Sequence, residues 1–95
     1  MADYETVEEY TITERGRVES VTIRRTDDPQ YPSGWDYALH YGTIGGETLI
    51  RYDNAHERTK GHERHTPNGT ERIEFPGMLA LWDRFDDEID ALRPD

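Results

Sequence analysis

Residues 35–53 read WDYALHYGTIGGETLIRYD, and this stretch decides the fold. Large side chains alternate along its first half, so that one face of an extended chain carries Trp35, Tyr37, Leu39 and Tyr41. The Gly45-Gly46 pair is typical of a tight hairpin turn, and residues 48–53 alternate again as a return strand. The pattern therefore predicts two antiparallel strands joined by a short turn.

Upstream of this hairpin the sequence predicts two more strands. Residues 10–13 alternate with the period of a strand, and residues 18–26 are rich in Val, Ile and Thr. The spacing of the apolar side chains in the second of these segments predicts a bulge near Glu19-Ser20. The acidic start of the chain, residues 1–9, has few apolar side chains and is expected to be loosely ordered.

Downstream of the hairpin the sequence predicts a loop, a short strand and a helix. Residues 54–69 show no periodicity and are expected to form a loop, whereas residues 71–75 read as a fifth strand. After Pro76, which suits the first turn of a helix, apolar side chains recur at three- and four-residue spacing: Met78, Leu81, Trp82, Phe85, Ile89 and Leu92. The expected fold class is α+β, a single domain over residues 1–95 with an antiparallel sheet of four to five strands packed against one C-terminal helix.

The chain is strongly acidic, with 21 acidic side chains against 11 basic ones and a formal net charge of −10. All of the basic residues except Lys60 are arginine. Such a surface is typical of a protein from a salt-accumulating halophile such as a halophilic archaeon, because concentrated salt screens the repulsion between carboxylates. The lack of cysteine excludes disulfides, thiolate metal sites and a cysteine nucleophile. No signal peptide opens the chain and no apolar run is long enough to span a membrane, so we expect a cytoplasmic protein.

One segment departs from this acidic composition. Residues 51–65 read RYDNAHERTKGHERH and hold three of the four histidines. The segment has four bases against three acids, which gives it a formal charge of +1 and leaves the rest of the chain at −11. Positive charge and titratable nitrogen are therefore concentrated in this signature segment, as we call residues 51–65.

Metal-independent cleavage of RNA is one chemistry that the signature segment supports. The reaction needs a base for the ribose 2′-hydroxyl, an acid for the leaving oxygen and cations for the phosphorane. Histidine suits both proton roles because its pKa lies near neutral pH. The expected catalytic residues are His56, His62, His65, Lys60 and Asn54. The expected substrate-binding residues are Arg64, Arg58, Arg51, Tyr52 and Asp53, with Tyr52 as the side chain that stacks on a base.

Two other interpretations of the segment stay open. In the first, His62 and His65, together with His56 or Asp53, bind a metal through three or four nitrogen and oxygen atoms. In the second, Asp53-Asn54 forms a turn and the histidines lie on a solvated loop without function. The concentration of histidines and bases in an acidic chain favours a functional site over this structural alternative. His40 lies outside the segment and is expected to have an ordinary cross-strand role.

The string Tyr52-Asp53-Asn54-Ala55-His56, followed by Lys60-Gly61-His62-x-x-His65, resembles the central signature of the TumE-type toxin family. The likeness extends over most of residues 18–92, including Tyr31-Pro32-x-Gly34 before the hairpin and Glu74-Phe75 before the helix. Between the two halves of the signature, Glu57-Arg58-Thr59 departs from the tighter form of the family's motif.

The resemblance implies a toxin that is encoded beside an antitoxin with a helix-turn-helix DNA-binding domain. RNA is the expected target, because many small toxins of similar size cleave RNA. No cofactor and no membrane partner are expected. A module that binds nucleic acid or protein without catalysis is an alternative, and so is a metal-dependent site on the same segment.

Overall fold

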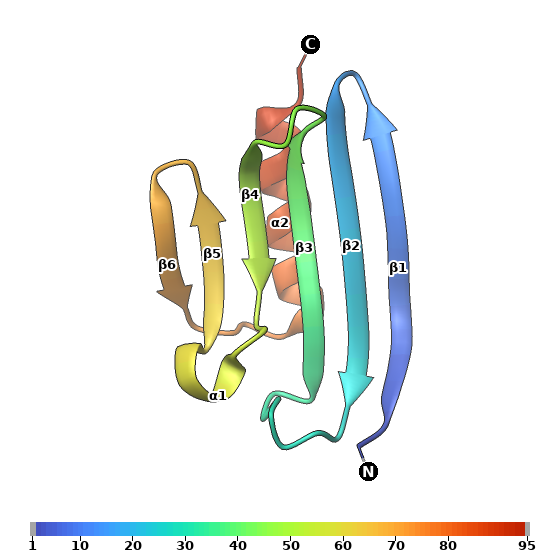
Figure 1. The fold of residues 1–95 in the computed structure, drawn as a ribbon, viewed down its shortest axis with the longest axis vertical. Coiled ribbons are helices and arrows are strands. Elements are labelled where there is room, and N and C mark those ends of the chain that lie inside the picture. Colours follow the sequence, from blue (N-terminus) through green and yellow to red (C-terminus); the bar gives the residue numbers. More distant parts are fainter. Residues whose placement is uncertain (1, 95) are drawn as a thin grey trace.

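The computed structural model describes residues 2–94, which form a six-stranded sheet and two helices (Figure 1). The strands are β1 (Tyr4–Glu14), β2 (Arg17–Thr26), β3 (Trp35–Thr43), β4 (Thr48–Asp53), β5 (His62–Thr66) and β6 (Gly69–Ile73). A single-turn helix, α1 (Glu57–Lys60), connects β4 with β5, and α2 (Met78–Leu92) follows β6. Each strand pairs antiparallel with the next along the chain, so the sheet is a meander in the order β1-β2-β3-β4-β5-β6.

The α+β class and the C-terminal helix are confirmed, with six strands rather than four or five. The difference lies in residues 54–69, where the prediction of a loop is wrong, because this stretch contains α1, β5 and the start of β6. Strand β5 has the sequence HERHT, with polar side chains on both faces. The sequence of such a strand shows no alternation of hydrophobic and polar residues, so it cannot be recognised by its pattern. In the structure, the strand is placed by backbone pairing with β4 and β6.

Strand β1 begins at Tyr4, so the expectation of a loosely ordered start does not hold for residues 4–9, while Met1 lies outside the described residues. Most side chains of β1 are exposed, and the strand is held by its backbone ladder to β2. Side chains add to this ladder at its first residue, where the Tyr4 hydroxyl donates to Asp28 at 2.5 Å. An edge strand needs few apolar side chains when its backbone groups are paired along one side.

The bulge in β1 lies between Thr6 and Glu8, and β2 runs regularly past the position predicted for a bulge at Glu19-Ser20. Glu19 itself is buried and points to the same side as Val21 and Ile23. Its carboxylate accepts a hydrogen bond of 2.9 Å from the Tyr10 hydroxyl. A glutamate therefore fills a core-facing position, which explains why the apolar spacing of this strand was misleading.

The core lies between α2 and one face of the sheet, where the helix crosses β3 and β4 (Figure 1). The sheet and the helix supply these fully buried side chains: Val21, Ile23, Tyr37, Leu39, Tyr41, Ile50, Tyr52, Met78, Leu81, Phe85 and Ile89. The other face of the sheet, which we call the open face, points away from α2. Of the described helices, neither has the length and apolarity needed to cross a membrane.

Two leucines in α2 test this packing, because they lie two residues apart and differ in burial. Leu81 is fully buried, whereas Leu79 is 75% exposed. We expect Leu81→Ala to lower the free energy of unfolding by about 2–5 kcal/mol, because it removes buried methyl groups and leaves a cavity. Leu79→Ala should change it by at most about 0.5 kcal/mol. Urea denaturation measures both values, and equal losses would contradict this orientation of the helix.

Candidate functional site

The pairing of β4 with β5 distributes the signature segment over two faces of the sheet. The register joins Arg51 to His65, Tyr52 to Arg64, and Asp53 to Glu63. Because side chains alternate along a strand, the middle pair faces α2 and the two outer pairs lie on the open face. By the same alternation, His62 lies on the side of Arg64, and His65 lies on the opposite side. The structure therefore separates two of the three histidines that were expected to act together.

The pair that faces α2 binds the helix. The hydroxyl of Tyr52 donates to Glu88 of α2, and Arg64 Nη2 lies 2.5 Å from Glu88 Oε2. Arg64 Nε also donates to the Tyr52 hydroxyl, at 3.2 Å. Burial and the Glu88 carboxylate raise the pKa of Tyr52 to about 12. Tyr52 does not offer the stacking surface expected from the sequence, because its side chain is fully buried.

Asn54 holds the end of β4 against β3. Its Oδ1 accepts the backbone N–H of Tyr37 at 3.0 Å, and its Nδ2 donates to the carbonyl of Trp35 at 2.6 Å. The same Nδ2 donates to Glu57 Oε1 at 2.8 Å. The side chain is completely buried, so a substrate cannot contact it without opening this network. In this arrangement the amide that was expected to be catalytic binds the backbone.

Glu57, the first residue of α1, extends the network to the loop before β3. Its carboxylate accepts the Ser33 hydroxyl at 2.6 Å and the Ser33 backbone N–H at 2.7 Å. Glu57 is buried although it is charged, and these bonds compensate for its loss of water. Glu57 belongs to the part of the signature that departs from the tighter form of the family's motif. Each of its carboxylate oxygens nevertheless has a hydrogen-bond partner.

His62 is the aromatic end of this network. Its ring stacks on Phe75 with the centroids 4.4 Å apart, and its Nδ1 is hydrogen bonded to the Tyr37 hydroxyl at 2.8 Å. Burial raises the pKa of Tyr37 well above its ordinary value, so this hydroxyl keeps its proton and can donate it to Nδ1. His62 Nε2 then faces Glu57 Oε1 at 3.4 Å. Burial lowers the pKa of His62, against the opposing effect of Glu57, so the ring is held in its neutral form.

Four other members of the signature segment lie together on the open face. His65 Nε2 lies 3.2 Å from Asp53 Oδ2, and its Nδ1 is hydrogen bonded to the Thr70 hydroxyl at 2.9 Å. Arg51 Nε donates to the same Asp53 oxygen at 3.0 Å. Ligand-type atoms of Asp53, Glu63 and His65 lie within 4.8 Å of one another. An imidazole, two carboxylates and a guanidinium are thus close together on a polar surface that α2 does not cover.

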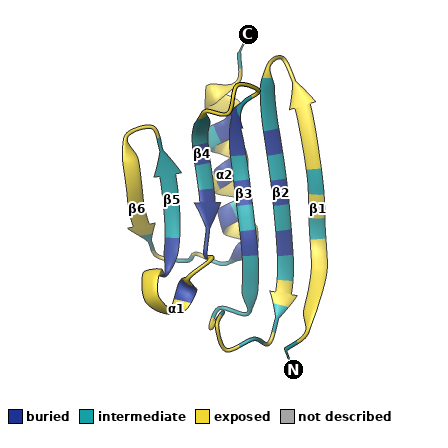
Figure 2. Ribbon diagram, viewed as in Figure 1, coloured by how far each residue is buried: buried dark blue, intermediate teal, exposed yellow. Residues whose placement is uncertain are grey.

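Three expected residues lie apart from this group. His56 precedes α1, and Arg58 and Lys60 lie on it; all three are exposed (Figure 2). Gly61 then turns the chain into β5 with a φ of 66°, and a Cβ at this position would come within 2.6 Å of Arg72 Nε. The positive φ favours glycine at this position of the signature, and the Arg72 side chain lies over it.

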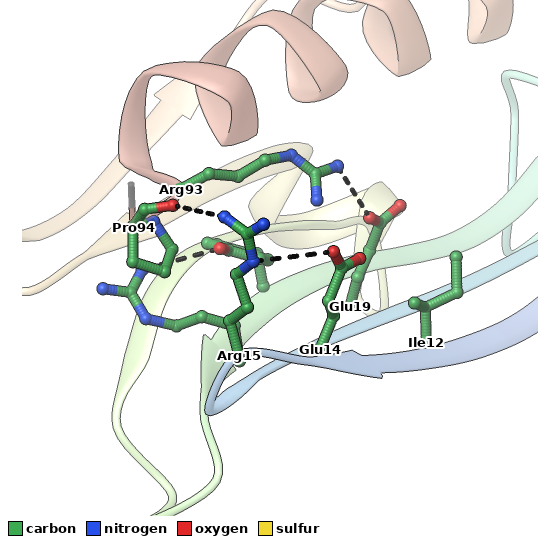
Figure 3. Close-up of a pocket in the computed structure, with 8 residues that line it drawn as sticks. Ile12, Glu14, Arg15, Glu19, Arg93 and Pro94 are labelled. Carbon is green, nitrogen blue, oxygen red and sulfur yellow. Dashed lines mark hydrogen bonds and ion pairs between the residues drawn. The ribbon is translucent and has the colours of Figure 1, made fainter.

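A small pocket lies elsewhere, between the β1–β2 turn and the end of α2 (Figure 3). Its arginines are already engaged: Arg15 contacts the Pro94 carbonyl at 3.5 Å, and Arg93 pairs with Glu19 at 3.6 Å. None of its lining residues belongs to the signature segment. We therefore take the open-face group as the candidate site.

In a comparison with protein families, residues 1–93 match the family model described as Toxin TumE. The chain belongs to the TumE toxin family. This membership confirms the resemblance inferred from the signature, and it makes the protein the toxin component of a toxin–antitoxin pair, with an antitoxin as partner. Comparisons with curated proteins and with solved structures found no match.

In this TumE toxin, half of the family signature is structural. Asn54, Gly61 and His62 hold α1 and the strand ends, whereas Asp53 and His65 meet on the open face. The sequence predicted only an ordinary cross-strand role for His40, which pairs in register with Arg51 on the open face. The only sequence signal for His40 was its place on the polar side of a clear strand.

The buried state of His62 predicts a pH dependence of stability. Since its pKa is lowered on folding, the unfolded chain binds more protons between the folded value and the ordinary value of 6.5. The free energy of unfolding should therefore decrease as the pH falls through this window. In His62→Gln this part of the decrease should vanish, whereas His56→Gln, a change at an exposed histidine, should retain it. Urea denaturation across the pH range gives the slopes, and identical slopes for wild type and His62→Gln would contradict the assignment.

Proposed function

We propose that this toxin cleaves RNA by acid–base chemistry on the open face of its sheet, with His65 as the central residue. The observation that carries the proposal is the contact of His65 Nε2 with Asp53 Oδ2 at 3.2 Å, while the imidazole side chain stays 30% exposed. A carboxylate beside an imidazole fixes the orientation of the ring and stabilises the imidazolium that forms during proton transfer. Of the three histidines in the signature segment, His65 combines a neighbouring carboxylate with a partly exposed ring, and since its Nε2 is shielded from solvent, a substrate would reach its Nδ1.

In the proposed reaction the ribose 2′-oxygen attacks the adjacent phosphorus after losing its proton to a base. The bond from phosphorus to the 5′-oxygen then breaks, and this leaving oxygen takes a proton from His65. The products are a 2′,3′-cyclic phosphate and a 5′-hydroxyl end. Arg51, which stands opposite His65 in the register, supplies positive charge to the phosphorane. His65 Nδ1 is hydrogen bonded to the Thr70 hydroxyl in the free protein. In the proposed complex an alcohol oxygen of the RNA replaces this hydroxyl at Nδ1.

Further contacts to RNA are assigned to α1, where Arg58 and Lys60 are exposed. Positive side chains near a cleavage site attract the phosphates on either side of it. The net charge of −10 opposes RNA binding, but the signature segment carries a formal charge of +1. In the salt-rich interior of a halophile the repulsion is screened, and hydrogen bonds supply most of the affinity.

The family membership supports the biological setting of this activity. In the proposed system the toxin acts in the cytoplasm, and an antitoxin with a helix-turn-helix domain, encoded beside it, neutralises it. Growth arrest in cells that lack the antitoxin is then the simplest readout.

We expect His65→Asn and Asp53→Asn to abolish growth arrest, and to lower RNA cleavage by the purified toxin about 100-fold or more, since acid–base catalysis contributes that much. Asp87→Asn on the exposed side of α2 is a matched control and should cleave at the wild-type rate. Cleavage is measured on total RNA in concentrated potassium chloride, and thermal melting verifies folding. If wild-type toxin leaves RNA intact at every pH, it acts by binding alone and the proposal is wrong.

A metal-dependent reaction is the second candidate, favoured by the convergence of Asp53, Glu63 and His65 within 4.8 Å. Two carboxylates and an imidazole suit divalent ions such as Mn²⁺ or Zn²⁺. These residues would orient the ion, and the ion would supply charge to the phosphorane. Under the first proposal, toxin treated with EDTA should keep its full rate of cleavage. Loss of activity in EDTA that added Mn²⁺ restores, together with loss in Glu63→Gln, would establish the metal-dependent mechanism in its place.

A further inference from the structure

Three side chains form a row across the open face, one from each of three neighbouring strands. His40 of β3 is paired in register with Arg51 of β4, and Arg51 is paired with His65 of β5. Residues paired in this way project from the same face of a sheet. Neighbouring strands lie about 4.8 Å apart, so the backbones of the two histidines are roughly 10 Å apart with the arginine between them.

The surroundings of His40 leave its imidazole uncommitted. The side chain is half-buried, and its Nδ1 is shielded from solvent without a hydrogen-bond partner among the described residues. The ring lies over Gly42, since a Cβ there would come within 3.0 Å of His40 Nε2. A histidine with an ordinary cross-strand role would use its ring nitrogens in hydrogen bonds, because an unpaired buried nitrogen is costly.

The charges around His40 favour its neutral form. On β2 the residue opposite it is Ser20, which is uncharged, and on β4 it faces Arg51, with Asp53 one diagonal step away. Burial, and then the Arg51 guanidinium, lower the pKa of His40. His65 differs in its neighbours, because the Asp53 carboxylate lies 3.2 Å from its ring. The surroundings of His40 thus suit a ring that accepts a proton, whereas His65 has a carboxylate beside it.

Cleavage of RNA by in-line attack needs this division of roles. The base that takes the 2′-hydroxyl proton and the acid that protonates the 5′-oxygen act on opposite sides of the phosphorus. One hydrogen bond of about 2.8 Å on each side, together with the width of the phosphorane, separates the two ring nitrogens. The backbones of two histidines two strands apart are separated by a similar distance, and Arg51 lies on the strand between them.

We propose that His40 is the general base of the toxin, and that His40, Arg51 and His65 together bind and cleave one phosphodiester of single-stranded RNA. This inference rests on the proposed ribonuclease function and adds the residue that starts the reaction. His40 accepts the proton of the 2′-hydroxyl, the 2′-oxygen forms its bond to phosphorus, and the phosphorane gathers its charge beside Arg51. The bond to the 5′-oxygen then breaks as His65 donates its proton, so that one proton is taken up and one is released in each cleavage.

The test compares wild-type toxin with His40→Asn, His40→Phe and His65→Asn, each freed of antitoxin, on a fluorescent single-stranded RNA. His40→Phe keeps a ring over Gly42, so it retains the packing and removes only the titratable nitrogens. Both His40 variants should lose about 100-fold or more in cleavage rate. Their affinity for the same oligonucleotide with 2′-deoxyribose, which cannot be cleaved, should stay within twofold of wild type. Ser20→Ala, which changes the facing residue on β2, is the matched control and should cleave normally.

The pH profile separates a proton-transfer role from a structural one. The rate of wild-type toxin should rise with pH as His40 loses its proton, because only the neutral ring can accept the proton of the 2′-hydroxyl. The residual activity of the His40 variants should lack this rise, which a merely structural role of His40 would leave in place.

Two outcomes would overturn the inference in distinguishable ways. If wild type cleaves and His65→Asn does not, while folded His40→Phe retains the wild-type rate and its rise with pH, His40 is not the base and the ribonuclease proposal stands. If wild type cleaves no RNA at any pH, both proposals fall together.

Discussion

The register between β4 and β5 is the constraint on which the rest of the molecule depends. Side chains on a strand alternate between faces, so a shift by one residue would exchange the two sets of signature residues. In the observed register Tyr52 and Arg64 meet Glu88 of the helix, and Asp53 and His65 meet on the open face. The same pairing therefore binds the helix to the sheet and builds the candidate site behind it.

The buried network around Asn54 fixes this register at the end of β4. Asn54, Glu57 and His62 link β3, α1 and β5 through hydrogen bonds that leave few buried polar atoms unsatisfied. Networks of this kind are specific because each partner is costly to leave unpaired. The network therefore fixes the end of β4, where Asp53, the residue before Asn54, pairs with β5. A polar motif can thus support a site without touching a substrate.

The sequence predicted the hairpin of β3 and β4 and helix α2, because the spacing of apolar residues indicates which face of an element is buried. It did not predict β5, since HERHT is polar on both faces and shows no such spacing. That omission had a consequence for the site. On a loop, His62 and His65 are free to converge, but on a strand a separation of three residues sends them to opposite faces. The sequence predicted only a cross-strand role for His40 for a related reason, because its neighbours on the open face come from other strands and only the register identifies them.

The distribution of charge determines from which side a polyanion can approach the molecule. Strand β1 carries four glutamates and no base, and α2 carries five acids against one arginine, so the far edge and the helix side repel a polyanion. The signature segment is the positive part of the chain, and its bases lie on β4, α1 and β5. Under the proposed function, an approaching RNA is therefore turned toward the end of the sheet near α1, where Arg58 and Lys60 are exposed. In an acidic protein, the difference in charge between one surface and another guides a charged substrate more than the net charge of the whole protein does.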